Sequence, residues 1–405
     1  MVLHRIFVLF CFLSLFSCDR SEKNLKNKKI NYTPQKIQAK DLSNSEESHL
    51  RVLSFYPLAA ETKMHSLDDE ITPTHKLYVR NNGHVPPLAY EKDFSKWSLK
   101  VDGAVHKTYN FSLKELKKKF KTYEYQIVLE CGGNGRAGFN PPGRGSQWSY
   151  GAVGAPLWKG VLLKDVLKSL GVKDSAVYVA YEGHDIHLSR DLNKKAISRG
   201  IPIKKALDPM TLLAFEMNRR PLTAEHGAPL RLVVPGYPGS ASGKWLKRLW
   251  VRTKVHDGAK MGGSSYRLPP YPVKPGTDIP VTEKWKIIEK MPVKSLITFP
   301  KSGLSTKKRE LEVRGFAWTS AQKIIAVDVS CDYGQTWSKA HLSEALNPYA
   351  WQRWKVKLKF PGKGYYEIWA RAKDSNGKMQ PMVVGNWNPK GYLNNAMPRI
   401  AVQIS

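Results

Sequence analysis

A single cysteine in a glycine-rich turn is the clearest candidate for chemistry in this sequence. The segment reads Cys131-Gly-Gly-Asn-Gly-Arg136, so a thiol and a guanidinium lie five residues apart. A thiolate is a soft, electron-rich metal ligand, and a nearby positive charge helps to keep it deprotonated. Taken alone, such a cysteine is more often simply buried. Its place in a turn, where glycines let the backbone approach a ligand, favours metal binding.

Cationic and polar side chains farther along the chain are candidates for an anion site. Guanidinium groups suit small oxyanions and phosphates, because they form forked, charge-assisted hydrogen bonds. Plainer roles stay open, since Arg231 could pair with a core carboxylate and His226 could be a satisfied buried histidine. His184 and His187 have the spacing of a metal pair, but no third ligand accompanies them, so we interpret them as loop histidines.

Recognisable helices and strands must position these residues. Ser112-Leu-Lys-Glu115 is a capping box that predicts a helix through Phe120. Alternating apolar residues then predict a strand from Tyr123 that ends at Cys131. Residues 161–170 have helical spacing and stop at a glycine, and apolar runs at 212–217 and 230–234 indicate buried elements.

The sequence lacks the common nucleotide-binding signatures. No GxGxxG follows a predicted strand, and there is no P-loop, which disfavours a nicotinamide dinucleotide or ATP enzyme. A helix-turn-helix, zinc finger or RNA-binding motif is also missing. The net charge of +31, from 65 Lys plus Arg against 34 Asp plus Glu, is spread along the chain. We therefore interpret it as a solvated basic surface and expect no nucleic-acid partner.

The chain changes character beyond Met291. Residues 311–318, 324–330, 354–360 and 365–372 are strand-like and are separated by turn formers such as Asp332-Tyr-Gly334. Several strands at near-regular spacing with interleaved tryptophans predict a β-sandwich of immunoglobulin type. Because 405 residues exceed one ordinary domain, a second domain is expected.

The N-terminus has the features of an export signal. A short basic start and an apolar run precede Leu15-Phe16-Ser17-Cys18, which is similar to a bacterial lipobox. We therefore expect a signal peptide over 1–18, a lipid on Cys18, a flexible tether over 19–50, and a periplasmic, membrane-anchored protein. Cleavage to a freely soluble protein is the alternative. The absence of CxxCH predicts no covalent c-type haem.

Taken in order along the chain, these segments resemble the sulfite oxidase family. The resemblance covers roughly residues 75–400 and rests on the ordered set of motifs rather than on any one. The segments that carry it are Val79-Arg80-Asn81, Cys131-Gly-Gly-Asn-Gly-Arg136, Gly151-Ala-Val-Gly154, Ala214-Phe-Glu-Met-Asn218, His226-Gly-Ala-Pro-Leu-Arg231, Val233-Val-Pro-Gly236, Lys244-Trp-Leu246 and Trp387-Asn-Pro-Lys-Gly391.

The resemblance implies a fold, a cofactor and a set of site residues. The fold class is α+β: a mixed α/β molybdopterin-binding domain over 51–288, followed by an immunoglobulin-like β-sandwich over 289–405 that serves dimerisation. The cofactor is molybdenum-molybdopterin, without haem, and Cys131 is the metal ligand. Arg80, Arg136 and Tyr266 face the substrate. Cofactor binding falls to Arg80, Asn81, Cys131, Asp185, His226, Arg231, Ser242, Gly243 and Lys244.

The implied reaction oxidises sulfite to sulfate, with water as the oxygen source and electrons passed to an external acceptor such as cytochrome c. One alternative is the sulfane dehydrogenase subunit of a thiosulfate-oxidising complex. An oxide reductase that runs the chemistry in reverse is a second, although the sandwich speaks against it. A cofactor-free basic lipoprotein that binds a partner is a third.

The sequence also departs from the family pattern. Animal and plant members carry Arg where this chain has Gly135, and His where it has Asn82, so one positive neighbour of the site is missing. The chain has no segment similar to cytochrome b5. We therefore expect a separate electron acceptor and a substrate affinity that differs from those members.

Overall fold

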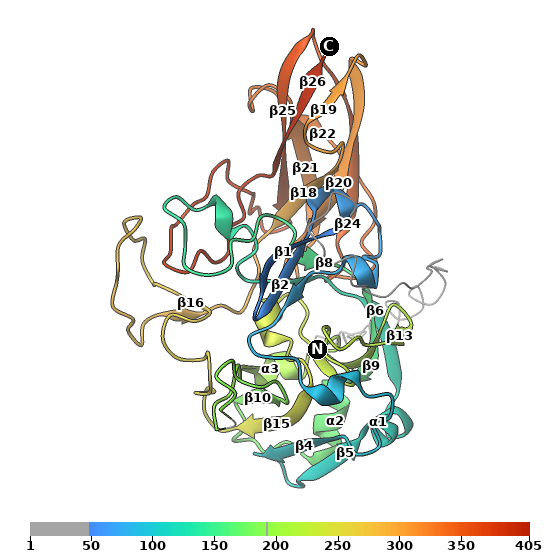
Figure 1. Cartoon of the computed structure of the whole chain (residues 1–405), viewed down its shortest axis with the longest axis vertical. Coiled ribbons are helices and arrows are strands. Elements are labelled where there is room, and N and C mark those ends of the chain that lie inside the picture. The colour runs from blue at the N-terminus through green and yellow to red at the C-terminus, as the bar shows by residue number, and fades with distance from the viewer. Residues whose placement is uncertain (1–47, 192) are drawn as a thin grey trace, which may run out of the picture. The chain divides into compact units, whose positions relative to one another are not determined.

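The computed structural model describes residues 48–191 and 193–405 (Figure 1). The predicted signal peptide and nearly all of the predicted tether lie outside the described residues. Strand β1 (Leu50–Phe55) begins one residue inside the predicted tether, because the side chain of Leu50 is fully buried. No helix within the two described ranges is long and apolar enough to cross a membrane.

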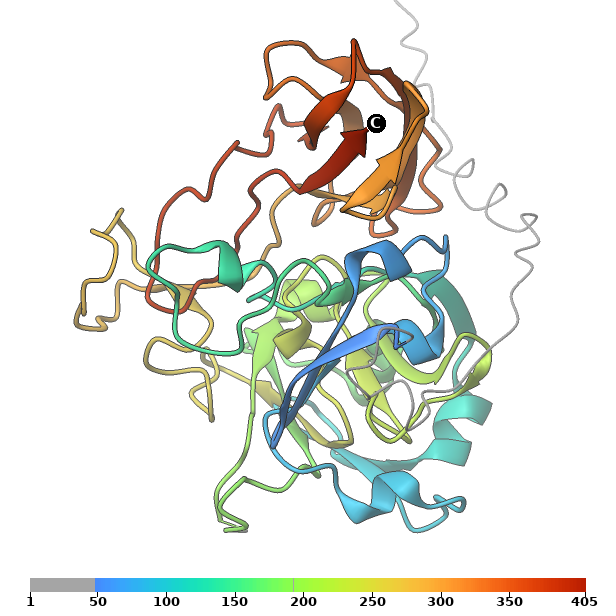
Figure 2. The ribbon, with the colours of Figure 1, turned by 45° about the horizontal axis from the view of Figure 1, so that its top comes forward.

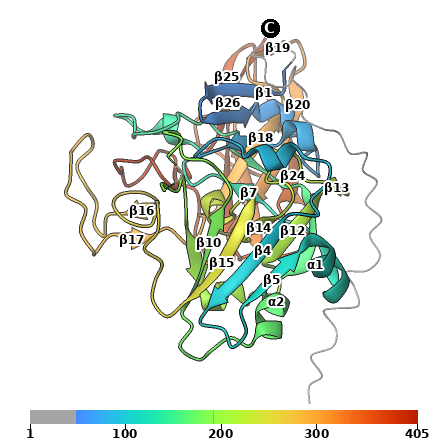
Figure 3. The same ribbon diagram turned by 60° about the horizontal axis from the view of Figure 1, so that its bottom comes forward.

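A five-stranded sheet forms one side of the N-terminal domain. Its order is β11-β10-β15-β4-β5, and only β15 and β4 run parallel (Figure 3). In β4, buried Leu99 and Val101 alternate with exposed Ser98 and Lys100, as a half-buried strand requires. The strands are β4 (Ser98–Gly103), β5 (Tyr109–Ser112), β10 (Tyr178–Gly183), β11 (Gly200–Pro202) and β15 (Leu246–Arg252).

A second sheet shares its core with the first. Its order is β13-β12-β9-β6, and β14 also pairs with β12. Leu213 of β12, Leu249 of β15 and Val166 of α2 belong to one buried apolar cluster, so two sheets and a helix enclose the same core. The elements are β6 (Thr122–Gln126), β9 (Leu157–Leu162), β12 (Leu212–Met217), β13 (Arg220–Pro221), β14 (Arg231–Val233), α1 (Leu113–Lys119), α2 (Leu163–Leu170) and α3 (Ile203–Ala206).

Most of the predicted local structure is confirmed, with one correction. The capping box of α1 is present, and α2 ends at Gly171, whose φ of 68° few other residues adopt. The single strand predicted up to Cys131 is wrong. It is two strands, β6 and β7 (Leu129–Glu130), and their partners are β9 and β8 (Val153–Gly154). Pro156 lies between those partners and has no N–H to continue one ladder.

The C-terminal domain is the predicted β-sandwich, and Figure 2 views it nearly along its strands. One sheet has the order β18-β20-β24-β23 and the other β19-β26-β25-β21-β22. Val313 and Trp354 of the first sheet and Val327 and Ala370 of the second belong to one buried cluster. The strands are β18 (Lys294–Phe299), β19 (Leu304–Thr306), β20 (Glu310–Trp318), β21 (Ile324–Ser330), β22 (Ser338–Lys339), β23 (His341–Leu342), β24 (Gln352–Lys359), β25 (Gly364–Asp374) and β26 (Arg399–Ile404).

A buried ion pair joins the sandwich to the strand that precedes Cys131. Lys294 Nζ, at the start of β18, lies 2.5 Å from Glu130 Oε1, and the two side chains are only 6% and 1% exposed. The indole N–H of Trp318 donates to the other carboxylate oxygen at 2.9 Å. Asn134 in the cysteine turn also donates to Glu130. The sandwich therefore contacts the strand and turn on either side of Cys131.

Candidate active site

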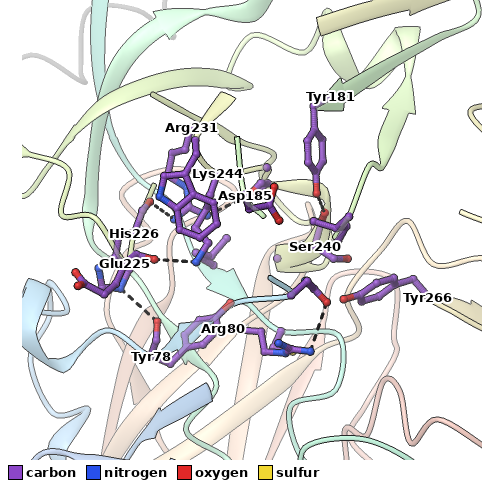
Figure 4. A pocket seen from close by; sticks show the side chains of 18 residues that line it. Tyr78, Arg80, Tyr181, Asp185, Glu225, His226, Arg231, Ser240, Lys244 and Tyr266 are labelled. Atoms are coloured by element: carbon purple, nitrogen blue, oxygen red, sulfur yellow. Dashed lines mark hydrogen bonds between the residues drawn. The ribbon is translucent and has the colours of Figure 1, made fainter. Parts of the chain in front are cut away.

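One pocket gathers most of the predicted site residues (Figure 4). Including the open space at its mouth, the pocket measures about 700 Å³. The predicted residues that line it are Arg80, Cys131, Asp185, His226, Arg231, Ser242, Gly243, Lys244 and Tyr266. Two predicted residues, Asn81 and Arg136, are not among its lining residues.

The backbone holds the thiol of Cys131 at this pocket. Its N–H donates to the Ala152 carbonyl at 2.9 Å, and its own carbonyl accepts from the N–H of Asn134, also at 2.9 Å. The side-chain oxygen of Asn134 accepts in turn from the Ala152 N–H. Cys131 is a free, half-buried cysteine. A rigid turn thus presents one thiol to the pocket without a disulfide partner.

Arg80 brings a guanidinium with spare donors to the same space. It ends β3 (Val79–Arg80), which pairs with β2 (Leu58–Thr62). Its Nη2 makes a long hydrogen bond of 3.4 Å to the side chain of Asn82, while its buried Nη1 has no partner. A buried donor without a partner is costly, so it indicates a place for a bound acceptor.

Arg231 supplies a second, deeper positive charge. It begins β14, is 3% exposed, and donates to the carbonyls of His226 at 2.9 Å and Ser242 at 3.2 Å. Its guanidinium carbon lies 4.8 Å from the ring centre of Trp158. Burial lowers its pKa to about 10, so it stays charged at neutral pH. Its Nε has no partner.

Lys244 adds a third basic side chain and accounts for the position of Asn81. The ammonium group donates to the side chain of Asn81 and to the Glu225 carbonyl. Burial and the charge of Arg231 hold the pKa of Lys244 well below its usual range. Asn81 is 1% exposed. Asn81 therefore does not line the pocket, but its hydrogen bond orients the Lys244 side chain that does.

Asp185 is the buried carboxyl group of the pocket. Burial raises its pKa to about 6, although the charge of Lys244 opposes the shift. Its Oδ2 is buried and has no partner. The group is therefore a carboxylate at neutral pH that can accept a hydrogen bond from a ligand.

His226 lines the pocket, but its ring is already engaged. Nδ1 lies 2.9 Å from the hydroxyl of Thr223, and Nε2 lies 3.3 Å from the carbonyl of Tyr78. Burial, together with the charges of Lys244 and Arg231, lowers its pKa to about 3. A neutral ring satisfies both contacts if Nε2 carries the proton and donates to the carbonyl. No ring nitrogen is left over for a ligand.

Comparison with known proteins identifies the family. Residues 83–260 match the model described as an oxidoreductase molybdopterin binding domain, and residues 285–405 match the Mo-co oxidoreductase dimerisation domain. The mitochondrial sulfite oxidase of Rattus norvegicus is 33% identical over 386 residues, covering 91% of this chain and 68% of that protein. The chain belongs to the sulfite oxidase family. It is a molybdopterin-dependent oxidoreductase.

Two further relatives agree with this assignment. The sulfite oxidase of Gallus gallus is 33% identical over 366 residues, covering 86% of this chain and 77% of that protein. Among solved structures, the sulfane dehydrogenase SoxCD from Paracoccus pantotrophus superposes with a TM-score of 0.71 at 27% identity. That match covers 87% of this chain and 86% of the other.

The pocket fits the cofactor of the sulfite oxidase family. It combines a free thiol with unpartnered buried donors on Arg80 and Arg231 and an unpartnered acceptor on Asp185. A phosphorylated pterin carries anionic groups for the guanidiniums and hydrogen-bonding edges for the carboxylate. Among the described residues, no three His, Cys, Asp or Glu side chains gather as metal ligands. Cys131, a free cysteine that lines the pocket, is the candidate protein ligand for the molybdenum of a bound cofactor.

The structure does not bring Arg136 into the pocket. This side chain is 6% exposed, and it donates to the carbonyls of Lys390 at 2.6 Å and Ser146 at 2.7 Å. Its guanidinium packs so closely on Gly133 that a Cβ there would lie 2.2 Å from a guanidinium nitrogen. Arg136 therefore fixes the cysteine turn against the C-terminal segment, instead of facing substrate as predicted.

Tyr266 does line the pocket, although its loop has no regular structure. Its N–H donates to the Tyr392 hydroxyl at 3.3 Å, its carbonyl accepts from Ile288, and the two tyrosine rings stack with centres 5.5 Å apart. Strand β16 (Arg267–Leu268) begins directly after it and pairs with β17 (Lys286–Ile287). Tertiary contacts thus replace the local anchoring that the sequence lacks.

Sequence reasoning missed part of the wall, including Tyr78, Tyr181 and Ser240. Tyr78 could have been found, because it lies two residues before Arg80 and strands repeat every two residues. The ring of Tyr181 explains why position 243 is a glycine, because a Cβ at that position would lie 2.4 Å from the ring. No sequence signal marks Ser240, whose carbonyl accepts from the Tyr181 hydroxyl at 2.7 Å.

Proposed function

We propose that the protein oxidises sulfite to sulfate and takes the added oxygen from water. One sulfite and one water then give one sulfate, two protons and two electrons. The observation that supports this proposal is the pocket in which the Cys131 thiol and the unpartnered Nη1 of Arg80 both lie. A guanidinium with free donors can hold a small oxyanion beside a metal in a fixed orientation.

The cofactor and the side chains of the pocket have separate roles in this reaction. Bound molybdopterin supplies the two-electron redox chemistry of molybdenum. Arg231 and Lys244 neutralise the anionic parts of the cofactor, while Arg80 binds the substrate anion. The hydroxyl of Tyr266 donates a hydrogen bond to a substrate or product oxygen. The free Oδ2 of Asp185 accepts a hydrogen bond or, at neutral pH, a proton.

The proposal includes the electron acceptor and the oligomeric state. The two electrons pass one at a time to a cytochrome c, and no haem is required in this chain. The basic surface attracts an acidic region of that cytochrome, an attraction that salt weakens. The match of residues 285–405 to a dimerisation domain supports a homodimer.

The proposal also includes the location of the protein. The sequence before residue 48 supports export and lipidation of Cys18. A Cys18→Ser variant should leave the membrane fraction, and an unchanged fractionation rejects the anchor.

Turnover of a purified, molybdenum-loaded sample tests the reaction. Metal content and sulfite-dependent reduction of ferricyanide or cytochrome c are measured on the same preparation. We expect two one-electron equivalents of acceptor reduced for each sulfite consumed. A full molybdenum complement without sulfite turnover rejects the proposed reaction.

A sulfane dehydrogenase is the second candidate, favoured by the structural match to SoxCD. Its substrate would be a sulfane sulfur carried on a partner protein rather than free sulfite. Assays with both substrates on one preparation separate the two functions. Activity that appears only with the protein-bound sulfane sulfur selects this second candidate.

A further inference from the structure

A buried arginine that the proposed mechanism does not use lies behind the pocket wall. Arg199, directly before β11, is 1% exposed. Its Nη1 donates to the hydroxyl of Ser240 at 2.5 Å, and its Nε has no partner. No carboxylate of the described residues forms an ion pair with it. The positive charge of Arg199 is therefore unusual, because buried charges are normally paired.

The same guanidinium contacts the ring of Tyr266. Its carbon lies 4.5 Å from the ring centre, within the range of a cation–π interaction. Tyr266 also stacks on Tyr392, which in turn lies 5.4 Å from the guanidinium of Arg136. Two arginines and two aromatic rings thus form one series of contacts. This series fixes a pocket tyrosine whose loop provides little support of its own.

Arg199 therefore contacts two lining residues from separate segments, Ser240 in the short 3-10 helix Gly239–Ala241 and Tyr266 in a loop. Figure 4 shows Ser240 and Tyr266 on one side of the pocket. The side chain does not itself line the pocket. An unpaired charge in a poorly screened interior acts over several ångströms. It adds to the positive potential that Arg80 creates in the same space, and that potential favours anions over neutral ligands.

We propose that Arg199 is a positioning and specificity-determining residue: it fixes Tyr266 and Ser240 in the pocket wall and adds a buried positive charge that selects an anionic substrate. The proposal rests on the proposed function, in which the substrate is a small oxyanion.

The test separates charge from packing. Arg199→Gln removes the charge and should raise the KM for sulfite about tenfold or more with a smaller change in kcat. Arg199→Lys keeps the charge and should stay within about threefold of the wild-type KM. Arg371→Gln is the control, because that guanidinium also stacks on a ring, at 3.8 Å from Trp337, but lies on β25 of the sandwich. It should behave as wild type.

Binding of sulfate to the holoprotein, measured by calorimetry, gives a readout that needs no turnover. The Kd for sulfate should rise in Arg199→Gln and stay close to the wild-type value in Arg199→Lys and Arg371→Gln. This readout does not depend on turnover. If the wild type fails to oxidise sulfite, the proposed function is rejected, but the role of Arg199 can still be tested. Equal losses in Arg199→Gln and Arg199→Lys, or no loss in either, overturn the proposal. If Arg199→Gln does not fold, Ser240→Ala decides instead. It removes the hydrogen bond that orients the guanidinium, and an unchanged sulfate Kd overturns the proposal.

Discussion

At the scale of single residues, backbone hydrogen bonds on both sides of Cys131 hold its thiol at the pocket. Its N–H and carbonyl are both hydrogen-bonded, and Asn134 closes the turn beneath it. A serine at this position would occupy the same place but offers a poor ligand to molybdenum. The contribution of position 131 to metal chemistry can therefore be measured without disturbing the turn.

We expect Cys131→Ser to fold, bind pterin and lose one sulfur from the molybdenum coordination sphere. Since changes even to outer-shell partners of metals cost about 10–100-fold, loss of a direct ligand should lower turnover more than about 100-fold. X-ray absorption at the molybdenum edge checks the ligand count, with Ser112→Ala as a control away from the pocket. An unaltered coordination sphere would rule out Cys131 as the ligand.

His226 gives a prediction about acid stability of the cofactor-free protein. Its pKa falls from 6.5 to about 3 on folding, chiefly through burial. The unfolded chain therefore binds the extra proton between these values, and stability that is complete above pH 6.5 is lost as the pH falls toward 3. The upper bound of this contribution is about 5 kcal/mol.

The variant His226→Gln cannot be protonated, yet its amide can still donate to the Tyr78 carbonyl. It should lose less stability than wild type between pH 7 and pH 4.5, measured by urea unfolding at each pH. At pH 7 it should be no more stable than wild type. Parallel pH profiles for the two proteins would contradict the assignment.

At the scale of elements, α1 shows a local signal that the structure follows closely. The hydroxyl of Ser112 accepts from the Glu115 N–H at 3.1 Å, and the Glu115 carboxylate accepts from the Ser112 N–H at 2.9 Å. Ser112→Ala should cost about 1 kcal/mol of unfolding free energy. Urea denaturation should show that loss with molybdenum content unchanged. A loss of metal would mean that α1 supports the pocket more directly than its contacts indicate.

The elements also show where sequence reasoning ends. Periodicity and capping are local, so they predicted α1, α2 and four of the sandwich strands, β20, β21, β24 and β25, within a few residues. The glycine turn singled out Cys131 for the same reason, and this residue lines the pocket. Arg136 was misplaced because its acceptor on Lys390 lies 254 residues away. Arg199 was missed because nothing in its immediate sequence marks a contact with Tyr266.

At the scale of the whole molecule, two domains meet at the Glu130–Lys294 ion pair. Removing one partner of a buried pair leaves a charge without compensation, which typically costs about 3–5 kcal/mol. Lys294→Met should lose that much unfolding free energy. Because Glu130 precedes Cys131, the variant should also bind molybdenum less completely.

The matched control for Lys294→Met is Asp68→Asn at another contact between the domains. Asp68 pairs with Arg314 and Arg353 of the sandwich, but these side chains are 20–28% exposed. Screening by solvent should keep the loss near or below about 1 kcal/mol. Calorimetric unfolding compares the two variants. Equal losses of unfolding free energy in the two variants would show that the buried pair stabilises the protein no more than the partly exposed one.

The contact between the C-terminal segment and the cysteine turn constrains the order in which the chain can fold during translation. In Figures 1 and 2 the loop after Cys131 lies beside this segment, and Asn394 donates to the Gly135 carbonyl across 259 residues. A ribosome must therefore translate most of the sandwich before the turn acquires its last support. In nascent chains stalled before residue 388 the turn would lack this support, so we expect molybdenum insertion to follow translation of the sandwich.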